Sequence, residues 1–131
     1  MAGYSEKSLQ QKLGITNRQS MLFLQAPKEY FATLGVLPKS VKLPHEKADF
    51  IHLFVTSRHE LESFTQTVIR SLAIGGMLWV SWPKKSARSI IPSDITEQDL
   101  RDAFLPLGVV DVKVCTVTEL WSGLKFVWRK S

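Results

Sequence analysis

Three apolar runs along the chain are predicted to form buried strands. Residues 20–27 (SMLFLQAP) form a short apolar run that ends at a proline, and residues 49–57 (DFIHLFVTS) and 77–83 (MLWVSWP) are nearly all apolar. Continuous apolar runs of this length are typical of strands that are covered on both faces, as parallel strands are. A fourth, shorter strand is predicted at residues 40–44 (SVKLP), where a proline closes it.

Helical spacing of apolar residues marks the segments between these strands. After residues 57–60 (SRHE), leucine, phenylalanine and valine recur at helical period up to Leu72. The S-x-x-E pattern predicts that Ser57 caps this helix and that Glu60 reaches back to it, and residues 74–76 (IGG) are expected to end it. Similar spacing predicts shorter helices at residues 5–13 and 28–35, and a helix that Thr96 caps.

The C-terminal part of the chain reads as a hairpin. Residues 109–117 and 124–130 alternate apolar and polar positions, and residues 119–123 can turn between them. Helices and strands otherwise alternate, which predicts an α/β fold: a three-layer Rossmann-like sandwich whose mostly parallel sheet ends in an antiparallel hairpin. We expect one domain over residues 1–131, with an exposed sheet edge near residues 124–130.

Composition limits the function only broadly. The 131 residues are 44% hydrophobic and 22% charged, and no apolar run approaches the roughly 18 residues that span a bilayer. The N-terminus lacks a secretory signal and Cys115 is the single cysteine, so a cytoplasmic protein that does not bind membranes is expected. The net charge of +5 is spread over both halves of the chain, which disfavours nucleic-acid binding without excluding it.

Two resemblances follow from these segments. Residues 48–55 (ADFIHLFV) and 72–84 (LAIGGMLWVSWPK) resemble the fourth and fifth strands of class I methyltransferases, including the Gly-Gly turn before the fifth. A closer match, over nearly the whole chain, is to a small uncharacterised bacterial family with a Rossmann-like fold. Its matching segments are GYSEKSLQQKLGI, LFVTSRHEL, GGMLWVSWPKK, DITEQDLRDAFLPLGVVDVKVC and WSGLKFV. That family implies a fold but no activity.

The methyltransferase resemblance is truncated where the cofactor would bind. Adenosylmethionine sites in that family need a Gly-rich loop after the first strand, so that the backbone can approach the ligand. Here no glycine occurs from Met21 to Ala32, and Pro27 removes an amide donor. Pro44 and His45 stand at the predicted end of the second strand, where an acidic residue would hold the ribose, and Glu46 one step further could serve in its place. The sequence therefore disfavours adenosylmethionine, and no cofactor is expected.

Ligands of open α/β sheets bind beyond the carboxyl ends of the strands, near the point where strand order reverses. Hydroxyl, basic and aromatic side chains gather at the predicted strand ends, where the start of the helix at Ser57 would add a positive pole. The candidate ligand-binding residues are Gln25, Thr56, Ser57, Arg58, Ser81, Trp82, Lys84, Lys85 and Trp121. The alternative is that Ser57 only caps its helix, that the charges are solvated and that the tryptophans pack in the core.

No other pattern predicts chemistry. The three histidines, His45, His52 and His59, lack the spacing of a metal site, and Cys115 reads as an inert buried thiol. The acidic residues from Asp94 to Asp102 read as the start of a helix. The sequence thus favours a non-catalytic domain that binds a small anionic ligand or a protein partner, or that forms a homodimer. An atypical methyltransferase-like transferase is the first alternative.

A second alternative is a nucleic-acid binder. It would use the basic residues of the loop after residue 83 together with the arginine that opens the predicted helix. These residues are Arg58, Lys84, Lys85 and Arg88.

Overall fold

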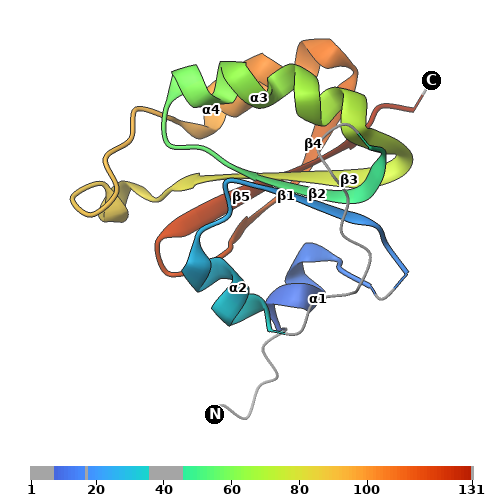
Figure 1. Cartoon of the computed structure of the whole chain (residues 1–131). Helices are drawn as coiled ribbons and strands as arrows, with labels where there is room; N and C mark the ends of the chain where they lie inside the picture. The colour runs from blue at the N-terminus through green and yellow to red at the C-terminus, as the bar shows by residue number, and fades with distance from the viewer. Residues whose placement is uncertain (1–7, 17, 36–45, 131) are drawn as a thin grey trace.

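One five-stranded sheet organises the protein (Figure 1). The computed structural model describes residues 8–16, 18–35 and 46–130. The strands are β1 (Met21–Leu24), β2 (Ala48–Phe54), β3 (Leu72–Pro83), β4 (Val109–Thr116) and β5 (Trp121–Trp128), in the order β1-β2-β3-β5-β4. β1, β2 and β3 pair in parallel, and β5 runs antiparallel to both β3 and β4. The predicted α/β class, with a mostly parallel sheet that ends in an antiparallel hairpin, is confirmed.

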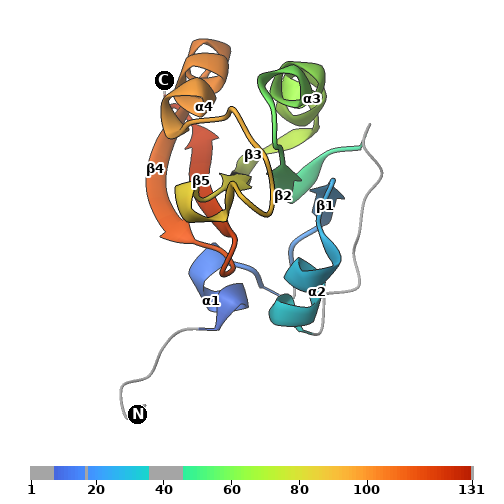
Figure 2. The same ribbon diagram turned by 90° about the vertical axis from the view of Figure 1, so that its left-hand side faces the viewer.

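Helices cover both faces of the sheet (Figures 1 and 2). Helices α1 (Leu9–Leu13) and α2 (Lys28–Leu34) lie on one face, and α3 (Arg58–Ser71) and α4 (Glu97–Phe104) lie on the other. Two 3₁₀ turns, η1 (Lys85–Ala87) and η2 (Leu105–Leu107), flank α4. The three layers agree with the Rossmann-like sandwich expected from the alternation of helices and strands.

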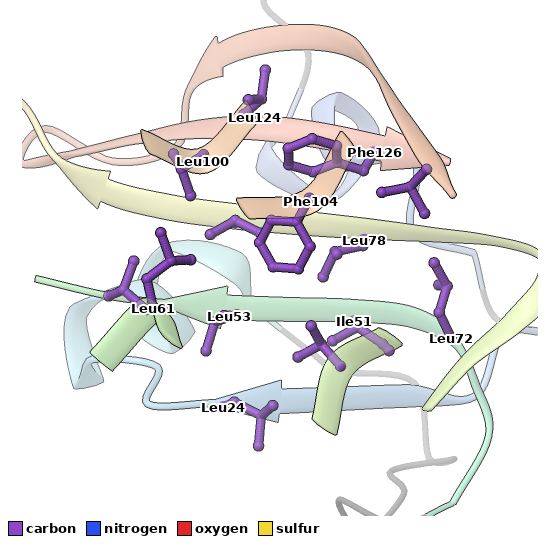
Figure 3. Packing of buried hydrophobic residues seen from close by; sticks show 14 of the residues in the cluster. Leu24, Ile51, Leu53, Leu61, Leu72, Leu78, Leu100, Phe104, Leu124 and Phe126 are labelled. Atoms are coloured by element: carbon purple, nitrogen blue, oxygen red, sulfur yellow. The ribbon is translucent and has the colours of Figure 1, made fainter. Parts of the chain in front are cut away.

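Each face of the sheet has its own hydrophobic cluster. Under α3 and α4 the cluster is mostly aliphatic, as Figure 3 shows for Ile51, Leu53, Leu78 and their neighbours. Under α1 and α2 the cluster is aromatic. Its fully buried rings are those of Tyr30, Phe50, Phe54 and Trp79. The predicted parallel strands are thus covered on both faces, because their apolar side chains alternate between the two clusters.

Capping residues fix where the two longer helices begin. The Ser57 Oγ accepts from the backbone N–H of Glu60 at 3.1 Å, as the sequence predicted. The Glu60 carboxylate, however, accepts from the backbone N–H and the hydroxyl of Thr56, one residue before the cap. At α4 the capping box is complete, with Thr96 and Asp99 bonded to each other's backbone N–H.

The boundary between α3 and β3 differs from the prediction. The helix ends at Ser71 and the strand begins at Leu72, upstream of the Gly-Gly pair. Leu72 pairs with Ala48 and Met77 pairs with Phe50, so the intervening residues bulge out of the ladder. The turn through this bulge needs Gly75, whose φ is 81°.

The edge of the sheet also differs from the prediction. β5 pairs on both sides, so residues 124–130 do not form the exposed edge. β4 borders the sheet instead, and Val112 and Val114 on it are about half exposed. Homodimer formation stays a prediction, and the strands that could support it are the two edge strands, β4 and β1.

Two other predictions concern parts of the chain that the structure does not describe. The strand expected at residues 40–44 lies outside the described residues, as does the start of the helix expected at 5–13. Within the described residues, no helix is both long and apolar enough to cross a bilayer.

The connections around β2 change sides of the sheet. α2 lies between β1 and β2 in the chain, whereas α3 connects β2 to β3 on the opposite face (Figure 2). A sheet whose connections leave neighbouring strands toward opposite faces has its topological switch point at the carboxyl ends of those strands. The switch point of this protein is therefore where β1 and β2 end, at Leu24 and Phe54.

Candidate functional site

Gln25 forms the turn that follows β1 at the switch point. Its φ is 60°, in the left-handed region, which residues other than glycine adopt rarely. Its side-chain amide donates to the backbone carbonyl of Phe54 at 2.8 Å, so it joins the carboxyl ends of β1 and β2. The turn that sequence reasoning assigned to a glycine is thus made by a glutamine, and its side-chain hydrogen bond offsets part of the backbone strain.

The start of α3 is already occupied by acidic side chains of this chain. The backbone N–H of Arg58 donates to the Asp94 carboxylate at 3.0 Å, and that of Thr56 donates to Glu60. The Arg58 guanidinium lies 3.6 Å from the Asp99 carboxylate. An anion at this helix start would compete with these carboxylates, so the expected positive pole is neutralised within the fold. The sequence predicts that Asp94 and Asp99 belong to a helix start, and their spacing does not show that they reach α3.

Ser81 lies inside the aromatic layer and is not exposed at the strand end. Its hydroxyl is 2.7 Å from Nε2 of His52, and Nδ1 of His52 is 2.9 Å from the hydroxyl of Tyr30. All three side chains are fully buried. Burial lowers the pKa of His52 to about 3 and raises the pKa of Tyr30. His52 is therefore a neutral, packed residue that bridges β2 to β3 and to α2.

The tryptophans among the candidates belong to the core. Trp82 is 8% exposed and packs under α3 and α4, whereas Trp121 is 5% exposed and packs in the aromatic layer. The Trp121 ring meets that of Phe54 edge to face, with centroids 5.1 Å apart. Because the two tryptophans pack on opposite faces of the sheet, they cannot stack on one ligand.

Lys84 and Lys85 line a cavity beside α4. The cavity measures about 460 Å³ and is bordered by η1, the start of α4 and the beginning of β5. Trp82 contributes to its wall, and Arg88 and Arg101 add further positive charge. The structure thus brings Trp82, Lys84 and Lys85 together, but it places them apart from Gln25 and from Ser81.

Glu46 is not at the carboxyl ends of the strands. It precedes Ala48, the first residue of β2, so it lies at the amino end of the parallel strands. A ligand at the switch point would be a full strand length away. Glu46 therefore cannot take the part of the displaced ribose carboxylate that sequence reasoning left open.

Solved structures similar to this chain include methyltransferases, whereas no family model and no curated protein matches the chain. A SAM-dependent methyltransferase from Aquifex aeolicus is 16% identical, with 88% of this chain and 85% of that chain covered and a TM-score of 0.64. The DhpI–SAH complex is 12% identical, with 92% and 82% covered and a TM-score of 0.62. The N-methyltransferase NodS from Bradyrhizobium japonicum is 11% identical, with 86% and 87% covered and a TM-score of 0.58.

These structures confirm the methyltransferase-like fold and contradict two expectations from the sequence. The sequence favours a non-catalytic binding domain and disfavours adenosylmethionine, yet two of these three structures are methyltransferases and the third is a complex with SAH. The physical reason for the second error lies at Gln25, which adopts the left-handed turn without being glycine. Membership of the small bacterial family stays a prediction.

Proposed function

We propose that this chain is a methyltransferase that binds adenosylmethionine where β1 and β2 end. The observation that carries the proposal is the left-handed turn at Gln25, which lies at the switch point of a sheet with the methyltransferase-like order. A ligand of an open α/β sheet binds at such a point. Adenosylmethionine would supply a methyl group that is electrophilic because it is attached to a sulfonium.

The described residues fit part of such a site. Gln25 supplies the turn, the following Ala26 adds little bulk, and Thr56 lies just beyond the end of β2 on the neighbouring strand. We assign these three residues to the cofactor, whereas Val55 between β2 and Thr56 is a buried residue of the aliphatic cluster. The chain would contribute chiefly by holding adenosylmethionine and the methyl acceptor in the correct relative orientation. Such positioning alone can lower the activation barrier of the transfer by several kcal/mol.

The test is calorimetric titration of the whole chain with adenosylhomocysteine, the product form of the cofactor. We expect saturable binding by the wild type and by Gln25→Gly, because glycine adopts a positive φ freely. Gln25→Val should weaken binding about tenfold or more, because a β-branched residue at this φ costs roughly 1–2 kcal/mol.

The matched control is Lys47→Gln, an exposed residue at the amino end of β2, which should leave the affinity unchanged. Circular dichroism on each variant separates loss of binding from loss of fold. A folded wild-type chain that binds no adenosylhomocysteine at millimolar concentration would overturn the proposal.

A further inference from the structure

Three cations without carboxylate partners converge on the cavity beside α4. Lys84, Lys85 and Arg88 all line it, and none of them has a carboxylate within ion-pair distance among the described residues. Arg101, which also lines the cavity, is matched by Glu97 and by Asp111, whose carboxylate is 3.0 Å from the Arg101 Nε. The cavity wall therefore carries an excess of three positive charges.

Backbone hydrogen bonds fix the turn that carries these three cations. The Lys84 N–H donates to the carbonyl of Leu120 at 2.9 Å, which ties the end of β3 to the turn before β5. η1 then begins, and the N–H groups of Ala87 and Arg88 donate back to Lys84 and Lys85. A tight turn anchored at its first residue thus presents like charges on one wall, where they repel one another unless an anion lies between them.

The fold fixes the guanidinium of Arg88 in the cavity wall. Its Nη2 donates to the carbonyl of Ile95 at 3.0 Å, which fixes the guanidinium. Its Nε is buried and has no hydrogen-bond partner in the described part of the chain. Because Nε is shielded from the cavity, an anion there would be bound by the other N–H groups of the guanidinium.

We propose that this cavity binds a small oxyanion of the phosphate class, held by Lys84, Lys85 and Arg88. Lysine supplies point charges for phosphate, and arginine supplies a planar set of donors for its oxygens. A volume of about 460 Å³ is that of an ordinary small-molecule site. The site does not depend on the proposed function, because Gln25, Ala26 and Thr56 are not among the residues that line this cavity.

A small ligand fits this charge distribution better than a nucleic-acid strand does. Non-specific nucleic-acid binding needs a groove of charge that follows several phosphates. Here the surplus charge is concentrated in one cavity, and Glu97 on its wall and Asp94 beside Arg58 interrupt any basic stripe toward α3. Arg58, counted with the basic loop in the nucleic-acid alternative, lies against Asp99.

The experiment measures binding of pyrophosphate and inorganic phosphate to the whole chain, by calorimetry at constant ionic strength set with chloride. We expect saturable binding by the wild type and at least about tenfold weaker binding by the double variant Lys84→Gln, Lys85→Gln, because hydrogen bonds to charged groups contribute that much. Arg88→Gln should weaken binding similarly, with circular dichroism confirming that the variant folds.

The matched control is the double variant Lys47→Gln, Lys130→Gln. It changes the net charge equally at two exposed residues at the opposite end of the strands, before β2 and after β5, and we expect wild-type affinity from it. The proposal is overturned if the wild type binds pyrophosphate no better than chloride, or if the folded Lys84, Lys85 variant binds as tightly as the wild type. Binding of a single-stranded oligonucleotide that needs Lys84 and Lys85, without binding of pyrophosphate, would likewise overturn it in favour of nucleic acid.

Discussion

His52 shows how a single buried polar residue is accommodated in an aromatic layer. Both of its ring nitrogens have hydrogen-bond partners, Tyr30 and Ser81, and its ring stacks on Phe54 with centroids 4.2 Å apart. A buried imidazole with both nitrogens satisfied avoids most of the cost of burying a polar group, provided that it stays neutral. The stability that this hydrogen-bond network provides therefore depends on pH.

We expect acid to destabilise the protein through His52. The folded-state pKa of about 3 lies below the unfolded value of 6.5, so between these values only the unfolded chain binds the proton. The free energy of unfolding should thus fall as the pH falls from 6.5 toward 3, by up to about 1.4 kcal/mol per pH unit from this residue. Urea unfolding of the wild type and of His52→Gln at several pH values measures the difference in slope.

Ser81→Ala serves as the control for this prediction. It removes one hydrogen-bond partner but leaves the imidazole buried, so the protein should lose stability at every pH and keep the wild-type slope. Equal slopes for the wild type and His52→Gln would show that His52 does not contribute the pH dependence.

At the scale of the element, α4 depends on its first residue. The helix has eight residues and is too short to be stable alone, so its capping box and its packed side chains Leu100 and Phe104 hold it in place. The hydrogen bond from the Thr96 N–H is the main reason that the pKa of Asp99 lies below its usual range, and Arg58 from α3 adds to the effect. Asp99 of the capping box therefore also links α4 to Arg58 at the start of α3.

Removing the cap should destabilise the fold measurably. We expect Thr96→Ala to lower the free energy of unfolding by about 1 kcal/mol, because both hydrogen bonds of the Thr96 hydroxyl are lost. These are the bond to the Asp99 carboxylate and the bond from the Asp99 backbone N–H. Thr96→Ser keeps the hydroxyl and should retain most of that stability. Chemical unfolding at neutral pH compares the two variants, and equal losses would mean that the methyl group, and not the hydroxyl, matters.

At the scale of the whole molecule, both hydrophobic clusters share the same strands. β2 and β3 send Ile51 and Leu78 to the aliphatic cluster, and Phe50 and Trp79 to the aromatic one. If β2 and β3 unfold, both clusters are exposed to solvent together. We therefore expect a single domain that unfolds in one step.

Tryptophan variants can test this cooperativity. Replacing Trp79 and Trp121 by phenylalanine leaves Trp82 and Trp128 as fluorescent reporters of the aliphatic cluster under α3 and α4. Replacing Trp82 and Trp128 instead leaves Trp79 and Trp121 as reporters of the aromatic cluster under α1 and α2. We expect fluorescence and far-ultraviolet circular dichroism to give one unfolding midpoint in each variant. A fluorescence midpoint that precedes the loss of secondary structure on one side would show that the layers unfold separately.

The fold was largely predictable because its buried strands are nearly continuous apolar runs. The runs at residues 20–27, 49–57 and 77–83 gave β1, β2 and the main part of β3. The order of the hairpin was not predictable, because alternation in β4 and β5 does not say which strand pairs with β3. The bulge at Gly75 was also hidden, since the Gly-Gly pair suggested a helix end.

The candidate site was harder to predict because its partners come from distant segments. Nothing near Arg58 in the sequence shows that Asp94 and Asp99 will reach it. The absence of glycine after β1 was a correct observation that led to the wrong cofactor expectation, because Gln25 adopts the backbone conformation by itself. The location in the cytoplasm stays a prediction.

The antiparallel position of β5 between β3 and β4 has a consequence for how quickly the protein folds. Val114 and Leu124 pair within a local hairpin, whereas Met77 must find Val127, and Met21 must find Phe50, across long stretches of chain. Hairpins form within microseconds, while distant pairings require loop closure before they stabilise anything. The hairpin of β4 and β5 should therefore form early, and its docking onto β3 should set a folding time of milliseconds or longer.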